Sequence, residues 1–215
     1  MSGPDGTTIP VTIKRASRHG WTKIVPVIRK MKGWIVRSMA HQPATGRSGT
    51  IDRLTQSLAD VLYAASITPD SYHYRSPAAA TGLEWLGTWS LAENLAHLAI
   101  YEENIAAPIL EAIVAGRDAA AEVNSVIESD YEARWQALSM SPLDEIAQRL
   151  SRARLRQADA VSAMSDELFQ APTTTLWTDV LAADGHSAAW VATKTFQHTW
   201  EHGNSILCIA LFAPS

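Results

Sequence analysis

Apolar residues recur at three- and four-residue steps in four long segments of the chain, which is the spacing of amphipathic helices. The predicted helices cover about residues 50–66, 90–116, 141–164 and 188–212. No segment shows the alternating pattern of a β-strand, and no internal repeat is visible. The sequence therefore predicts an all-α fold, and four such helices in one chain indicate a four-helix bundle.

Short polar motifs mark the places where three of these helices begin. Ser90 is followed three residues later by Glu93, which predicts a capping box at the start of the second helix. Ser141 and Pro142 predict an N-cap and a first turn for the third helix. Ser187 is the predicted N-cap of the last helix. Local sequence therefore sets these helix ends in addition to the apolar pattern.

The connections between the helices are long for a minimal bundle, so we expect crossover loops. The less regular stretch 117–139 is predicted to contain one short helix at about 131–138. Inside the second helix, Pro108 predicts a kink. Half of the eight tryptophans lie in the predicted loops, at Trp21, Trp85, Trp89 and Trp177. They supply enough aromatic surface to cover one end of a pocket.

The composition fits one globular domain with a proper core, because 47% of the 215 residues are hydrophobic. No apolar run reaches the roughly 18 residues of a membrane span, so we expect a cytoplasmic protein. The single cysteine, Cys208, excludes an internal disulfide framework and a multi-thiolate metal cluster. It lies in an apolar part of the last helix and is expected to be inert packing. Any metal site must therefore use His, Asp and Glu.

Basic residues are concentrated at the start of the chain. Residues 1–49 contain nine Lys and Arg and one acidic residue, within a total net charge of −4. The remainder holds nine basic and 21 acidic residues, a net charge of −12. This asymmetry predicts a basic N-terminal extension over 1–49 and an acidic folded domain over 50–215. The domain would repel phosphate, so nucleic acid is expected to bind only through the extension.

The extension has three interpretations. A basic tail could contact nucleic acid or another acidic surface. A segment that is almost free of acidic residues also suits a targeting peptide, although its apolar stretch is short and interrupted by Pro26. The interpretation we prefer is a dispensable extension, with the natural start at Met31 or Met39.

His198 and His202 form the most specific local pattern in the sequence. Residues four apart on a helix lie almost above one another, so both imidazoles can reach one ion. Neutral imidazole suits Zn, Ni, Fe or Cu better than Mg or Ca. An apolar stripe slightly to one side of the pair is predicted to be buried, at Ala189, Phe196, Trp200, Gly203 and Leu207. Taken alone, the two histidines fit packing or hydrogen bonding equally well.

His97, in the middle of the second helix, completes a set of three histidines drawn from two helices. Such a set leaves positions on a metal ion open for water or a substrate atom. Tyr101, one turn further on, is a candidate polar group beside the ion. Three carboxylates could orient the rings or could equally be surface charges: Glu93, Glu102 and Glu201.

Two segments around these histidines resemble a known family. Trp89-Ser-Leu-Ala-Glu-Asn-Leu-Ala-His97-Leu and His198-Thr-Trp-Glu-His202-Gly-Asn-Ser-Ile are similar to the second-helix and last-helix patterns of the DinB-like superfamily. That superfamily includes mycothiol-dependent maleylpyruvate isomerases and bacillithiol transferases. The resemblance covers about residues 50–212. It does not explain the basic extension.

The resemblance implies a metal site and a class of chemistry. In the family, the matching histidines bind a divalent metal, Zn or Ni, at one end of a four-helix bundle, which assigns this role to His97, His198 and His202. Characterised relatives use the metal to ionise a low-molecular-weight thiol, whose thiolate attacks an electrophilic substrate. The implied function is a thiol-dependent S-transferase or isomerase acting on a small molecule.

Other functions stay open at this point. The sequence His-x-x-Glu-His also matches the inverted zinc-protease motif, with Glu201 as general base. That motif needs a further ligand well downstream, and only 13 residues follow His202. A stronger alternative is a bundle that binds metal or a small ligand without turnover, as a sensor or structural partner. A homodimer is compatible with either function.

Overall fold

The computed structural model describes residues 46–118, 131–172 and 187–213. These residues form helices, and one isolated antiparallel β-bridge pairs Pro172 with Ser187. Most of the expected N-terminal extension, residues 1–45, lies outside the described residues. No described helix has both the length and the apolar character needed to cross a membrane.

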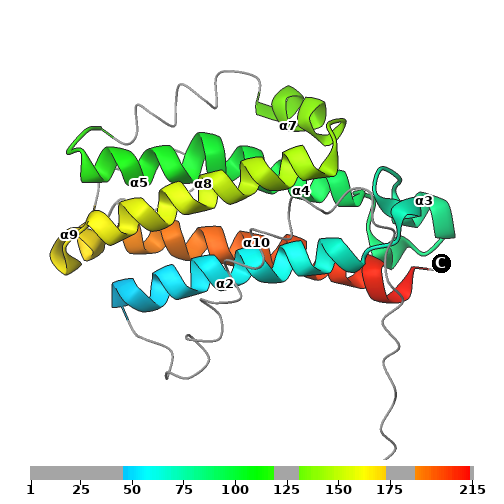
Figure 1. Cartoon of the computed structure of the whole chain (residues 1–215), viewed down its shortest axis with the longest axis horizontal. Coiled ribbons are helices and arrows are strands. Elements are labelled where there is room, and N and C mark those ends of the chain that lie inside the picture. The colour runs from blue at the N-terminus through cyan, green and yellow to red at the C-terminus, as the bar shows by residue number, and fades with distance from the viewer. Residues whose placement is uncertain (1–45, 119–130, 173–186, 214–215) are drawn as a thin grey trace, which may run out of the picture.

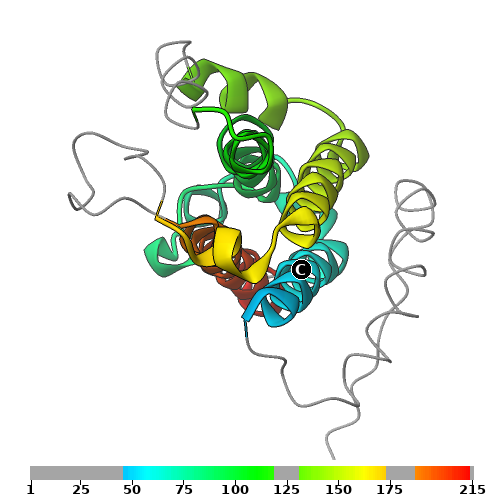
Figure 2. The ribbon, with the colours of Figure 1, turned by 90° about the vertical axis from the view of Figure 1, so that its left-hand side faces the viewer.

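Four long helical segments lie side by side and form the bundle (Figures 1 and 2). They are α2 (Gly46–Ile67), the composite segment α4 (Leu91–Tyr101) with α5 (Ala107–Val114), α8 (Leu143–Ala163) and α10 (Ala188–Phe212). Helices α2 and α10 run in one direction, and α4–α5 and α8 run in the other (Figure 1). Because α4–α5 and α8 run the same way, the chain must cross back along the bundle between them. The predicted all-α bundle with a long crossover is confirmed.

Short helices occupy the connections. The predicted short helix is present as α7 (Tyr131–Ser139), which packs on the outside of α4. The sequence pattern did not reveal the small elements η1 (Asp70–Tyr72), α3 (Pro77–Thr81), η2 (Glu84–Leu86) and α9 (Asp166–Gln170). They are too short for an apolar repeat to mark them. Local chemistry forms them instead, as where Ser76 caps α3 and Gly82, with φ of 73°, ends it.

Two of the three predicted helix starts are confirmed. The Ser90 hydroxyl accepts from the Glu93 N–H at 3.2 Å, and the Glu93 carboxylate accepts from the Ser90 N–H at 2.7 Å. Ser187 caps α10 by accepting from the Trp190 N–H at 3.2 Å. The prediction for Ser141 is wrong, because Pro142 is the N-cap residue and no side chain caps α8. With ψ of 138°, Pro142 stays extended, and the helix begins one residue later than predicted.

The kink predicted at Pro108 takes the form of a π-helical turn just before it. This turn, η3, spans Glu102–Ala106 between α4 and α5. Its extra residue lets the Ala107 N–H donate to the Glu102 carbonyl, five residues earlier. Pro108 then falls in the first turn of α5, a position that tolerates its missing N–H. The turn also directs the Glu102 side chain into the bundle, where it is fully buried.

The buried face of α10 differs from the predicted apolar stripe. Trp200 is 70% exposed and Leu207 is 36% exposed, whereas Thr195 and Thr199 are buried. The two threonine hydroxyls donate to carbonyls one turn earlier, at 3.1 and 2.8 Å, so their burial leaves no unpaired donor. Hydrophobicity alone therefore misplaced the helix face.

A buried ion pair joins the helices at mid-bundle. Arg154 of α8 and Glu102 of η3 are 1% and 0% exposed. The Arg154 Nε donates to the Glu102 carboxylate at 2.7 Å, and a second guanidinium nitrogen donates to its other oxygen. The same guanidinium donates to the Ser57 hydroxyl of α2 at 2.8 Å and to the Thr199 hydroxyl of α10 at 2.6 Å. One side chain therefore bonds to all three other segments of the bundle.

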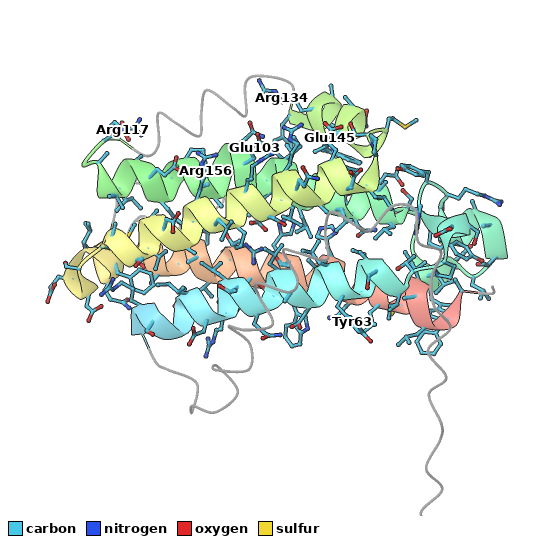
Figure 3. The ribbon with its side chains drawn as sticks, viewed as in Figure 1. Tyr63, Glu103, Arg117, Arg134, Glu145 and Arg156 are labelled. Atoms are coloured by element: carbon cyan, nitrogen blue, oxygen red, sulfur yellow. The ribbon has the colours of Figure 1, made fainter. Side chains whose placement is uncertain are left out.

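Replacement of Arg154 by leucine is expected to lower the free energy of unfolding by about 3–5 kcal/mol, because it leaves the Glu102 carboxylate buried without its partner. Urea denaturation followed by circular dichroism measures the change. The matched control is Arg156→Leu, since Arg156 pairs with Glu111 between α8 and α5 with both side chains more than a third exposed (Figure 3). That variant is expected to lose about 1 kcal/mol or less. Equal losses in the two variants would contradict a special role for the buried pair.

Candidate metal centre

Helices α4 and α10 bring the three predicted histidines together. His97 lies in the middle of α4, and His198 and His202 lie one turn apart on the face of α10 that packs against α4. The His198 Nε2 atom is 3.1 Å from the Nε2 atom of His97 and 3.1 Å from that of His202. All three ligand atoms lie within 4.8 Å of one another. The three rings therefore point their Nε2 atoms at one place.

The size of this cluster matches the coordination sphere of a small divalent ion. An ion with metal–nitrogen bonds of about 2.0–2.1 Å holds neighbouring nitrogens about 3 Å apart at angles near 90–110°. Neutral imidazoles place a lone pair or one N–H on each Nε2, so three such atoms cannot all satisfy one another. A cation between them would accept all three lone pairs.

The environment keeps the imidazoles in the neutral form that binds metal. Burial lowers the pKa of His97. Burial, followed by the charges of His202, His97 and Arg154, lowers the pKa of His198 to about 3. Burial and the charge of His97 lower the pKa of His202 to about 4. At neutral pH all three rings are therefore uncharged and available as ligands.

Asn94 is a site residue that the sequence analysis missed. Its side-chain N–H₂ donates to the Trp89 and Ser90 carbonyls at 3.2 and 2.9 Å, which fixes the amide oxygen toward His202. That oxygen accepts from His202 Nδ1 at 2.8 Å. Because an amide oxygen only accepts, the proton lies on Nδ1 and the lone pair on Nε2. The available signal was the position of Asn94, three residues before His97 and so on the same helix face.

The three carboxylates proposed from the sequence do not orient the rings. Glu93 is held in the capping box with Ser90. Glu102 is taken up by the buried ion pair with Arg154. Glu201 points outward and is exposed. The expected carboxylate role therefore falls to the neutral amide of Asn94.

Aromatic rings pack around all three imidazoles, and His97 and His198 depend on this packing most. The Nδ1 atoms of His97 and His198 are buried and have no hydrogen-bond partner among the described residues. Trp89 lies flat on the His202 ring, with centroids 5.5 Å apart and planes 17° apart, and lies 5.0 Å from His97. Tyr101 meets the His198 ring edge-on at 4.7 Å. Ring packing therefore holds the imidazoles where hydrogen bonds do not.

The other predicted site features are only partly brought together. Of the four loop tryptophans, Trp89 reaches the histidines, whereas Trp85 packs on Phe212 at 5.5 Å. Trp21 and Trp177 lie outside the described residues. Cys208 is partly exposed rather than deeply buried and is not in the ligand cluster.

Comparison with known proteins gives a family and nothing finer. The sequence model of the DinB superfamily matches residues 51–206. This range contains most of α2, all of α4, α5 and α8, the three histidines and Asn94. No protein of curated function and no solved structure is significantly similar to the chain.

The metal-free protein is expected to lose stability as the pH falls below about 6.5. The lowered pKa values mean that the folded chain keeps the imidazoles neutral at pH values where the unfolded chain protonates them. The unfolded state then binds more protons, so the free energy of unfolding decreases on acidification, over a window from pH 6.5 down to about 4 for His202 and about 3 for His198. Urea denaturation in chelator at pH 7.5, 6.0 and 5.0 measures this slope. His198→Gln should flatten the slope, and an unchanged slope would contradict the argument.

Proposed function

The chain belongs to the DinB superfamily, and we propose that it is a metalloprotein in which His97, His198 and His202 bind one divalent ion through their Nε2 atoms. The observation that carries the proposal is the convergence of three neutral imidazoles, with His198 Nε2 3.1 Å from the Nε2 atoms of both His97 and His202. Zinc and nickel are the ions we favour, because both accept all-imidazole ligand sets.

Three protein ligands support a site that works on an added molecule. Structural zinc sites are closed by four protein ligands, whereas catalytic sites keep at least one position for water or substrate. No fourth His, Cys, Asp or Glu joins the cluster among the described residues. The three ligands are neutral, so the ion would keep its double positive charge and favour an anionic donor.

We propose a thiol-dependent transfer or isomerisation as the reaction class. A divalent cation lowers the pKa of a bound thiol, so that the thiolate dominates at neutral pH. The residues of this chain would hold the ion, keep the three imidazoles neutral and limit water with the rings of Trp89 and Tyr101. Burial and the charge of Glu102 raise the pKa of Tyr101 to about 12, so its phenol stays protonated beside His198.

A bundle that binds metal or ligand without turnover is the second candidate. The flat contact of Trp89 on His202 favours it, because a ring lying over a ligand restricts access to the ion. The rate of metal exchange separates the two candidates. An ion open to solvent is removed by a chelator within minutes, whereas an occluded ion is removed only as fast as the bundle opens.

Metal analysis tests the proposal directly. Protein purified without chelators is expected to contain one equivalent of zinc or nickel, and His198→Gln is expected to lose it, because one of three ligands is gone. Elemental analysis after gel filtration gives the stoichiometry. His73→Gln is the control, since the His73 ring lies 3.2 Å from the Thr68 carbonyl and is outside the cluster. A native protein that is metal-free and takes up neither ion on addition would overturn the proposal.

Removal of the Asn94 side chain is expected to weaken metal binding about 10- to 100-fold while all three ligands remain. In Asn94→Ala the His202 Nδ1–H loses its acceptor and the ring loses its fixed orientation. Competition against a chromophoric chelator measures the affinity. The control is Glu93→Gln, which alters the cap of the same helix without touching an imidazole. An equal loss of affinity in both variants would point to general damage to α4.

A further inference from the structure

Three aromatic side chains border the cluster of three histidines and are not themselves candidate metal ligands. Trp89 and Trp135 contact each other with ring centroids 4.9 Å apart and planes tilted by 35°. Trp135 and Tyr131 both meet the His97 ring edge-on, at 5.8 and 6.3 Å. We name Trp89, Trp135 and Tyr131 the aromatic wall. Two separate parts of the chain build it, the loop before α4 and the helix α7.

Helix α7 adds two of these rings from outside the four-helix bundle. It lies against α4 beyond the ring of four long segments (Figures 1 and 2). Tyr131 and Trp135 are one turn apart and so share a face. Leu138, on the same side, is 4% exposed and anchors the helix in the core. Tyr131 and Trp135 are only partly buried, which leaves ring surface accessible beside His97.

The side chains in direct contact with the three imidazoles are uncharged, although the charge of Arg154 acts on His198. Within the described parts of the chain, the ring contacts and hydrogen bonds that the imidazoles make with other residues come from Asn94, Tyr101 and the aromatic wall. Burial raises the pKa of Tyr131, so its hydroxyl stays neutral as well. An apolar body would replace water at ring faces.

We propose that the aromatic wall binds the electrophilic substrate beside the ion, and that this substrate carries a flat aromatic or conjugated group. The inference rests on the proposed metal function and names the substrate class for the same site. Aromatic rings prefer offset-stacked or edge-on partners with centroids 4.5–7 Å apart, and Trp135 and Tyr131 already make edge-on contacts of this kind with His97. A saturated ring cannot approach a tryptophan face as closely. The aromatic preference corresponds to roughly 3- to 10-fold in affinity.

Two probes with the same metal-binding group test this preference. Benzohydroxamate and cyclohexanecarbohydroxamate share the donor atoms and carry a flat and a saturated six-membered ring, respectively. Titration calorimetry of the full zinc-loaded chain is expected to show the benzo compound binding about 3- to 10-fold more tightly. The saturated probe is the more hydrophobic of the two, so a simple hydrophobic pocket would give the opposite order.

Three variants test whether the preference for the flat-ring probe depends on Trp135. Trp135→Leu keeps apolar volume and is expected to bring the two affinities within about twofold, whereas Trp135→Phe keeps a flat ring and the preference. Trp200→Leu removes a tryptophan that is 70% exposed and lines a groove against α2, so it is expected to change nothing. Zinc content and circular dichroism of each variant show that the fold and the ion are retained.

The outcomes distinguish a failure of the aromatic wall from a failure of the proposed metal site. A zinc-loaded chain that binds both probes equally, binds neither, or keeps its preference in Trp135→Leu overturns the aromatic wall alone. A chain that holds no zinc overturns the proposed metal function and this inference with it. Loss of the preference in Trp135→Leu together with its retention in Trp135→Phe and Trp200→Leu would support the flat-ring site.

Discussion

The buried contact between Arg154 and Glu102 is the constraint on which the rest of the molecule depends. The guanidinium reaches α2, η3 and α10 from its place on α8. On α10 it donates a hydrogen bond to the hydroxyl of Thr199, the residue between His198 and Trp200. Successive helix residues are about 100° apart, so a Thr199 that faces the ion pair fixes the rotation of the whole helix. That rotation turns His198 and His202 toward His97 and leaves Trp200 in solvent.

The contact between Arg154 and Glu102 also positions residues on the α4 side of the site. Glu102 is the first residue of the π-helical turn, and Tyr101, immediately before it, lies edge-on to His198. A buried charge pair adds little net stability, because desolvation offsets its attraction, but a single misplaced element would leave a charge unpaired. Gln157 extends the network by donating to Glu102 at 2.8 Å. The pair therefore selects one arrangement of α4 and α10 among many that would bury similar apolar area.

Features that depend on neighbouring residues could be predicted from the sequence, whereas features that depend on contacts between helices could not. The capping box of Ser90 and Glu93 acts within one helical turn, so its outcome was readable from four residues. The convergence of the three histidines followed from helix spacing and from the family resemblance. The face of α10 was misjudged because Trp200 is more hydrophobic than Thr199, and only the position of Arg154 on another helix reverses their burial. Glu102 and Asn94 were hidden in the same way, since their roles depend on partners that helix packing supplies.

The site also separates the residues proposed to hold an ion from the rings proposed to meet a substrate. The imidazoles and Asn94 lie on α4 and α10, whose relative rotation the ion pair fixes. Tyr131 and Trp135 lie on α7, which stands between α5 and α8 in the chain and packs mainly on the outer side of α4. A change of ring on α7 is therefore expected to alter what packs beside His97 while leaving the three imidazoles and Asn94 in the chain. Under the proposed function, metal binding and substrate choice would therefore depend on different elements, with α7 and the loop before α4 forming the substrate side of the site.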